Sequence, residues 1–438
     1  MNRLAVAAPK PQSPDVSDTD TGAVAGARRN EHRKDQKRSA RRTLPESSSL
    51  AKSSGVDLDQ LRKHIRTLIT LEETEAPMLS CYIHREGSRL ESSGLFKHRI
   101  RALQSIVQES ERKHFDDALN RLDLYLATQL QAMTQGVALF ARSGASPFFL
   151  GLQFQVPLQN RLSMHSTPDI FPLVELKDSY DRYVVVIATE EKVRILEINL
   201  GAVTRELWTQ QPQLRRRVGR QWTREHYQNH RRDRDARFLK EKINILDKLM
   251  SSGGHTHLIL AGSPRVTGRI RNALPSHLLE RLIDCVSASA QSATADVVAA
   301  TLSTFIEHEQ QAALDTVAEL VGALRRGSLG AAGTAATLAA LRHGEADVVV
   351  MAQSYTPTPA WRCHQCGWIG GVESPPEHCP DCASEELRSV NAKEAIVKLA
   401  ERQSLAVEFV EHSDALMALG GVGCLLRYPA ADPHPWTH

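Results

Sequence analysis

Four cysteines in the last hundred residues have the spacing of a metal-binding module. Cys363 and Cys366 form one Cys-x-x-Cys pair, and Cys379 and Cys382 form a second pair after twelve intervening residues. Each pair can present two thiolates on one tight turn, and two such turns supply the four sulfur ligands that Zn²⁺ binds in a tetrahedron. The spacing therefore predicts a structural zinc ribbon over residues 361–383, since four sulfur ligands leave no open position for water. A pair of redox dithiols is the alternative interpretation.

A second candidate site is the arginine-rich stretch at residues 214–234, which contains only two acidic residues. Guanidinium groups bind phosphate oxygens through paired hydrogen bonds and stack on bases, and aromatic residues within the stretch add stacking surface. Gly219 precedes Arg220 and Gln221, and a glycine there permits backbone angles that are closed to other residues. The stretch predicts an RNA contact, with a solvated helix start as the alternative. The predicted RNA-binding residues are Arg215, Arg216, Arg217, Arg220, Trp222, Arg224, Arg231 and Arg232.

Other patterns give weaker indications of catalysis. Asp233, Asp235 and Glu241 could bind a metal as in a nuclease, although on a basic helix such acids more commonly form side-chain pairs. The glycine-rich residues 327–333 could cradle a phosphate, but they lack the Gly-x-x-x-x-Gly-Lys-Ser/Thr string of phosphate-binding loops. The histidines for which the sequence indicates no hydrolytic partners are His226, His230, His255 and His257.

The overall composition limits the class of protein. A length of 438 residues suits two to four domains, and a net charge of +3 is too small to identify a partner by itself. No apolar run approaches the roughly 20 residues that span a bilayer, so we expect no membrane segment. The cysteines outside the two pairs stand singly in apolar runs, which suits a reducing cytoplasm better than a disulfide framework.

The elements that must position these residues begin after a basic arm. Residues 1–55 lack apolar periodicity and are predicted to be disordered. Residues 28–42 carry eight Arg or Lys against two acidic residues, which suits a non-specific RNA-binding arm or a solubilising tail.

After the arm, strand and helix patterns alternate and predict three α/β domains at residues 56–176, 177–308 and 309–438. The zinc ribbon is an insertion in the third domain. The longer helices are expected at residues 95–111, 115–133, 224–250, 294–308, 312–324, 334–341 and 392–401. The strands are expected at residues 78–84, 136–141, 148–156, 183–188, 192–199, 257–261, 282–286, 348–351, 406–410 and 422–427.

Several of these segments resemble one known superfamily. Residues 419–428 (LGGVGCLLRY) and 333–352 (GTAATLAALRHGEADVVVMA) are similar to its third domain, and residues 258–264 (LILAGSP) are similar to its central domain. The chain thus resembles a bacterial member of the archaeo-eukaryotic class-one release-factor superfamily, which includes Pelota and Balon. The resemblance is good over residues 180–428 and weak over residues 56–176. A zinc ribbon after the strand at residues 348–351 is shared with archaeal members.

The resemblance implies a role for the arginine-rich stretch. In release factors the loop at this place carries Gly-Gly-Gln, enters the peptidyl-transferase centre and helps to cleave peptidyl-tRNA. Gly219 and Gln221 match the first and last residues of that motif and are the candidate catalytic residues, whereas Arg220 replaces the middle glycine. A side chain there excludes glycine-only backbone angles, a strain on the order of 1–3 kcal/mol. The stop-codon-reading Asn-Ile-Lys-Ser stretch of the superfamily is not found in residues 56–176.

The expected function is therefore that of a cytoplasmic factor that binds the ribosomal A site without reading stop codons. Its partners would be ribosomal RNA, peptidyl-tRNA and a translational GTPase that delivers it. Either rescue of stalled ribosomes with peptide release or hibernation of idle ribosomes fits this expectation. An RNA-processing enzyme such as a nuclease, or another RNA-binding zinc-ribbon protein, is the alternative from a different class.

Overall fold

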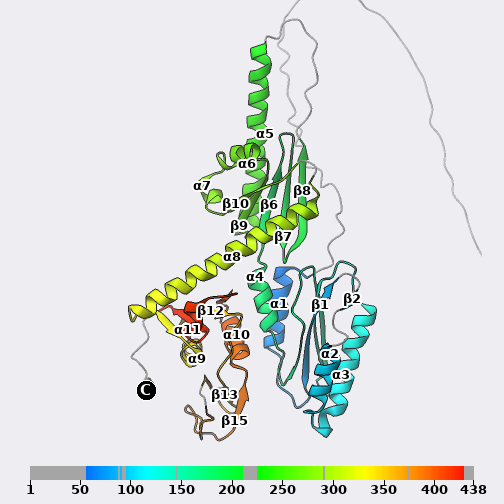
Figure 1. The fold of residues 1–438 in the computed structure, drawn as a ribbon, viewed down its shortest axis with the longest axis vertical. Helices are drawn as coiled ribbons and strands as arrows, with labels where there is room; N and C mark the ends of the chain where they lie inside the picture. The colour runs from blue at the N-terminus through cyan, green and yellow to red at the C-terminus, as the bar shows by residue number, and fades with distance from the viewer. Residues whose placement is uncertain are drawn as a thin grey trace, which may run out of the picture. The chain divides into compact units, whose positions relative to one another are not determined.

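The computed structural model describes residues 56–86, 89–90, 95–144, 146–210, 224–289, 292–371 and 374–428, so the predicted arm at residues 1–55 lies outside the described residues. Within these ranges the chain forms four β-sheets with helices packed against them, as Figure 1 shows. The mixed α/β class expected from the sequence is confirmed. The domain boundaries at residues 176 and 308 remain a prediction.

The first sheet is antiparallel and is covered on both faces. Its order is β2-β1-β3-β4, and β5 pairs with the first half of β1. Helix α1 packs with Tyr82 and Phe140 on one face, whereas Phe115 and Leu122 of α3 pack with Leu139 on the other. The elements are α1 (Leu58–Ile69), β1 (Met78–Glu86), β2 (Arg89–Leu90), α2 (Leu95–Gln104), α3 (Glu109–Thr128), β3 (Gly136–Arg142), β4 (Phe148–Phe154) and β5 (Arg161–His165).

The central sheet has the order β10-β9-β6-β7-β8. The pairings of β6 with β9 and of β9 with β10 are parallel, and β6, β7 and β8 form an antiparallel meander. Its elements are β6 (Tyr183–Ala188), β7 (Lys192–Asn199), β8 (Ala202–Gln210), α5 (Arg224–Gly253), β9 (His257–Gly262), α6 (Pro264–Arg271), α7 (Ser276–Leu279) and β10 (Leu282–Ser287).

Two layers of helix cover this sheet. On one face Val184 and Leu258 pack with residues of α5 and α6, and on the other face Val185 and Ile259 pack with α8 (Thr294–Arg325). Successive side chains of a strand point to opposite faces, so neighbouring residues of β6 and β9 enter different cores. Both strands are therefore continuous apolar runs, which is typical of parallel strands covered on both sides.

The third sheet has the order β11-β17-β12-β16, with β12 and β16 parallel. Phe171 of α4 (Phe171–Ser179) packs edge-on against Phe409 of β16, with ring centroids 5.2 Å apart. The remaining elements of this part are β11 (Gly330–Ala332), α9 (Thr334–His343), β12 (Ala346–Ala352), α10 (Ala392–Arg402), β16 (Ala406–Val410), α11 (Asp414–Ala418) and β17 (Val422–Leu426). A separate sheet in the order β14 (Ile369–Gly371), β13 (Ala360–Cys363) and β15 (Leu387–Val390) forms the ribbon between β12 and α10.

The structure corrects several predicted elements. The helix expected at residues 95–111 ends at Gln104 and the next begins at Glu109. Ile106, which was expected on the buried face of one helix, lies in the intervening turn with 72% of its surface exposed. Strands β2, β5, β8 and β11, the three strands of the ribbon, and helices α4, α7 and α11 were not predicted. The helices expected at residues 294–308 and 312–324 are one continuous helix, α8 (Figure 1).

Helix α8 enters two cores. Its first half buries Val297 and Phe305 in the core of the central sheet, and its second half buries Val317 and Leu320 in a core shared with the third sheet. The turns between these halves are polar, which explains why the sequence pattern indicated a break there. Among the helices that the structure describes, none is long and apolar enough to cross a membrane.

The Phe305 side chain provides a test of the core between the central sheet and the first half of α8. It is fully buried and stacks on Tyr183 with ring centroids 4.5 Å apart. Replacement by alanine should lower the free energy of unfolding by about 3–5 kcal/mol, because it removes buried area and leaves a cavity. Urea unfolding followed by fluorescence or circular dichroism measures the change. The control is Leu314→Ala, at a residue of the same helix that is 37% exposed, which should cost less than about 1 kcal/mol. Similar losses of stability in both variants would contradict the assignment of Phe305 to the core of the central sheet.

Candidate functional site

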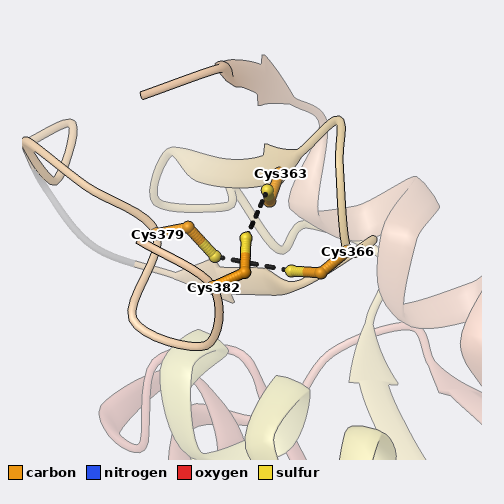
Figure 2. A group of neighbouring side chains, drawn as sticks. All are labelled: Cys363, Cys366, Cys379 and Cys382. Carbon is orange, nitrogen blue, oxygen red and sulfur yellow. Dashed lines mark hydrogen bonds between the residues drawn. The ribbon is translucent and has the colours of Figure 1, made fainter. Parts of the chain in front are cut away.

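The four cysteines of the predicted ribbon converge in space. The Sγ atoms of Cys363 and Cys382 are 3.5 Å apart, and those of Cys366 and Cys379 are also 3.5 Å apart. All four sulfurs lie within 4.8 Å of one another and point toward a common centre (Figure 2). A tetrahedral ion with Zn–S bonds of about 2.3 Å places its sulfurs about 3.8 Å apart. The cluster can therefore hold one metal ion with only small side-chain movements.

Two similar turns present the sulfurs. The N–H of Gly367 donates to the carbonyl of Cys363 (3.1 Å), and the N–H of Ala383 donates to the carbonyl of Cys379 (2.8 Å). The residue after the second cysteine of each pair is left-handed, with φ of +77° at Gly367 and +57° at Ala383. The strands β13 (Ala360–Cys363), β14 (Ile369–Gly371) and β15 (Leu387–Val390) frame these turns, and Trp368 packs beside the buried cysteines.

The electrostatics of the cluster favour a cation. The backbone N–H of Cys366 stabilises the thiolate of Cys363 and lowers its pKa to about 6. The backbone N–H of Ser384 has the same effect on Cys382, but desolvation and the neighbouring sulfurs outweigh it and raise the pKa of Cys382 to about 12. Four adjacent sulfurs cannot all ionise without a positive charge between them, and a divalent ion supplies that charge.

The histidines near the cluster are not ligands in this arrangement. His364 and His378 have side chains that are 57% and 56% exposed, and they lie near the carboxylates of Glu386 and Glu385. The ligand group consists of the four cysteines alone. Four thiolates complete a tetrahedron, so a metal bound here has a structural role and no site for substrate.

The arginine-rich stretch lies mainly outside the described residues. This applies to residues 211–223 and hence to Gly219 and Gln221. Arg224, Arg231 and Arg232 lie in the first turns of α5, where the structure defines the helix but not the side chains. The RNA-binding and catalytic assignments therefore remain predictions. The other members of the set outside the described residues are Arg215, Arg216, Arg217, Arg220 and Trp222.

The structure does define what holds the two ends of this segment. It follows β8, the edge strand that pairs with β7, and it leads into α5. One stripe of α5 faces the core, because Leu246 and Met250 are buried and Leu239 and Ile243 pack on the same cluster. Figure 1 shows the N-terminal half of α5 extending past the sheet. The segment is thus tied at both ends to one packed domain.

The acidic residues proposed for a nuclease do not form a metal site. Asp233 and Glu241 are exposed on α5. Among the described residues, the groups of side chains able to bind a metal include neither of these acids nor Asp235. Within the described residues, a nuclease that uses these acids therefore has no metal site.

Of the remaining sequence candidates, the side chains of His226 and His230 lie outside the described residues, and the structure places the others. Residues 330–332 form β11, and a Cβ atom at Gly330 would lie 3.2–3.3 Å from side chains of α8, so this glycine permits close packing. His255 is buried beside Glu197, with 3.8 Å between Nε2 and the carboxylate. His257 lies near His308 and Glu309, a grouping that the sequence did not indicate because α8 is distant along the chain.

Sequence comparison identifies the class of the central segment as that of archaeo-eukaryotic release factors. Residues 168–305 match the family described as "Bacterial archaeo-eukaryotic release factor family 10". The matched range includes the central sheet, the arginine-rich stretch and the first part of α8, and it confirms the resemblance to this superfamily. A search of curated proteins found no match to this sequence.

Solved structures of the same class are similar to most of the chain. The archaeal translation termination factor aRF1 is 16% identical, with 86% of this chain and 100% of that chain covered and a TM-score of 0.24. Ribosome-bound archaeal Pelota, described with ABCE1, is 12% identical, with 86% and 95% covered and a TM-score of 0.39. Dom34 of S. cerevisiae, described as interacting with Hbs1, is 11% identical, with 68% and 81% covered and a TM-score of 0.37.

The two cysteine turns give a paired prediction. Gly367→Ala should weaken metal binding about tenfold. The added Cβ would meet no other described residue within 4 Å, so the loss would come from left-handed backbone strain of about 1–2 kcal/mol and not from a steric clash. Ala383→Gly should strengthen metal binding a few-fold, since it relieves the same strain at some cost in chain entropy. Competition with a chromogenic chelator measures both affinities. If both substitutions changed the metal affinity in the same direction, left-handed backbone strain would not be the cause.

Proposed function

We propose that this protein binds the ribosome as a factor of the release-factor type, without reading stop codons. The observation that carries the proposal is the family match over residues 168–305, which contains the Gly-Arg-Gln segment between β8 and α5. The cytoplasm is the compartment that this role requires. A GTPase partner that delivers the protein to the ribosome is part of the same proposal.

The chemistry of the arginine-rich segment supports an RNA surface as its target. Arginine binds phosphate through two parallel hydrogen bonds, and this contact needs no base sequence. Because the ribosome presents a fixed arrangement of phosphates, shape and charge together can place the segment near peptidyl-tRNA. Binding through several arginines releases counterions and is therefore sensitive to salt.

Co-sedimentation with ribosomes tests whether the protein binds the ribosome through the arginine-rich segment. Purified protein should pellet with ribosomes at low salt and dissociate as salt rises. Replacing Arg215, Arg216 and Arg217 together with glutamine should lower the slope of log affinity against log salt by roughly 2–3, since each phosphate contact contributes about 0.7–0.9. Arg265→Gln is the control, because that side chain is 80% exposed in the same domain but outside the segment. Failure of the wild type to sediment even at low salt would contradict ribosome binding.

The residue at position 220 bears on two roles within this class, which are peptide release during ribosome rescue and occupation of idle ribosomes during hibernation. Its side chain excludes the backbone angles that a middle glycine allows and adds bulk to a loop that must approach RNA closely. We therefore favour occupation of the ribosome, as in hibernation, over peptide release by the wild-type protein. Peptide release by the wild type on stalled complexes would instead assign it to rescue.

Substitution of Arg220 makes this distinction measurable. Arg220→Gly should raise the rate of peptide release from ribosome-bound peptidyl-tRNA by at least tenfold, whereas Arg220→Ala removes the bulk but not the backbone restriction and should gain less. Gln221→Ala in the Arg220→Gly background should abolish the gain. No gain at saturating ribosome would count against the placement of Gln221 near the peptidyl-tRNA ester.

The cysteine cluster supports this function structurally. We propose that it binds one Zn²⁺ that joins the two cysteine turns of the ribbon to each other. Cys366→Ser should lose this ion and lower the melting temperature, as measured by elemental analysis and calorimetry. Cys285→Ser is the control, since that thiol lies outside the cluster and should leave the metal content unchanged. Equal metal content in both variants would refute the ligand role of Cys366.

A further inference from the structure

His257, His308 and Glu309 form a compact group of ligand atoms away from the cysteine cluster. The Nε2 atom of His257 is 3.5 Å from Oε1 of Glu309, and Nδ1 of His308 is 3.7 Å from the same oxygen. One ligand atom from each residue lies within 4.8 Å of the other two. Two imidazoles and a carboxylate are a donor set that suits Zn²⁺.

The spacing of these atoms fits a tetrahedral ion. Zinc bonds of about 2.0–2.2 Å to nitrogen and oxygen place neighbouring ligands about 3.4 Å apart. The observed separations of 3.5 and 3.7 Å exceed this by about 0.1 and 0.3 Å. The side chains of His257 and Glu309 are each 23% exposed and that of His308 is 41% exposed. An ion can therefore enter from solvent and remain largely enclosed by protein.

A second observation concerns the orientation of His257. Oγ1 of Thr256 is 2.9 Å from Nδ1 of this imidazole. When Nδ1–H donates to that hydroxyl oxygen, Nε2 keeps its lone pair and faces Glu309. A hydrogen bond on the nitrogen that does not bind metal is the usual support of a metal-ligating histidine. The ring of Phe305 packs edge-on at 5.5 Å between centroids and restricts rotation of the imidazole.

Other carboxylates surround the group. Asp181 and Glu408 both interact electrostatically with the carboxylate of Glu309. A divalent ion would supply positive charge to carboxylates that otherwise repel one another.

We propose that His257, His308 and Glu309 form a second zinc site that fastens the middle of α8 to the first residue of β9. The two α8 ligands follow Phe305 and precede Ala313, so they lie in the part of the helix between its two buried stripes. Three protein ligands leave the fourth tetrahedral position to water. This site does not depend on ribosome binding or on the cysteine cluster.

Metal replacement separates the two sites in the full-length protein. Protein stripped of metal and reloaded with Co²⁺ should bind two ions per chain. The cysteine site gives sulfur-to-metal charge-transfer absorption, whereas an imidazole–carboxylate site gives only weaker d–d bands. His308→Ala should lose the second ion and keep the charge-transfer absorption, and Cys366→Ser should have the opposite effect.

Conservative variants guard against loss of folding. Glu309→Gln keeps the size of the side chain and should weaken Zn²⁺ binding at this site at least tenfold. Thr256→Val removes the support of His257 and should weaken it roughly 10- to 100-fold. His277→Ala is the control, because that imidazole pairs with Asp247 at 2.8 Å elsewhere in the domain, and it should retain both ions.

Two results would overturn the proposal. One is a single ion per chain in the wild type, with thiolate absorption only. The other is two ions per chain that are retained by both His308→Ala and Glu309→Gln, which would place the second ion elsewhere. Circular dichroism of each variant establishes that a lost ion reflects a lost ligand in a folded chain.

Discussion

The parallel pairing of β6 with β9 is the contact on which the central part of this protein depends. Each strand is buried on both faces, and its alternate residues enter two different cores. One face fixes α5 and α6, and the other fixes α8. Because apolar burial contributes about 25 cal/mol per Å² without regard to direction, the specificity of this arrangement comes from the hydrogen-bonded register of the strands.

That register also positions the functional segments. From β6 the chain runs through β7 to the edge strand β8, and the arginine-rich segment begins beyond its end. The C-terminal half of α5 returns over the same sheet, so the segment has a packed support at each end. His257, at the start of β9, meets α8 at the opposite end of the sheet from the last residue of β8. The same sheet thus places an RNA-binding candidate at one end and a metal-binding candidate at the other.

The features that the sequence predicted well depend on residues close together in the chain. The Cys-x-x-Cys pairs are local turns, so their spacing alone identified the ligands that the structure brings together. The strands at residues 183–188 and 257–261 are continuous apolar runs, and the buried stripe of α5 has a clear helical period. In each case the short-range pattern and the final environment agree, which is why the prediction was correct.

The features that were missed depend on tertiary contacts. Strand β8 is an edge strand with exposed, polar side chains at several positions, and it is held by pairing to β7 and by the Arg194–Glu206 ion pair. No local apolar pattern marks such a strand. The proximity of His257 to His308 and Glu309 arises only when α8 packs on the sheet. A single sequence carries no signal for that contact.

The continuity of α8 also constrains how this chain can vary among relatives. Each added residue rotates the following part of an α-helix by about 100°, so one insertion between Phe305 and Ala313 would turn the second buried stripe away from its core. Seven added residues would restore the face to within about 20° but would lengthen the helix by about 10 Å. Insertions and deletions should therefore accumulate in loops, while this stretch keeps a constant length.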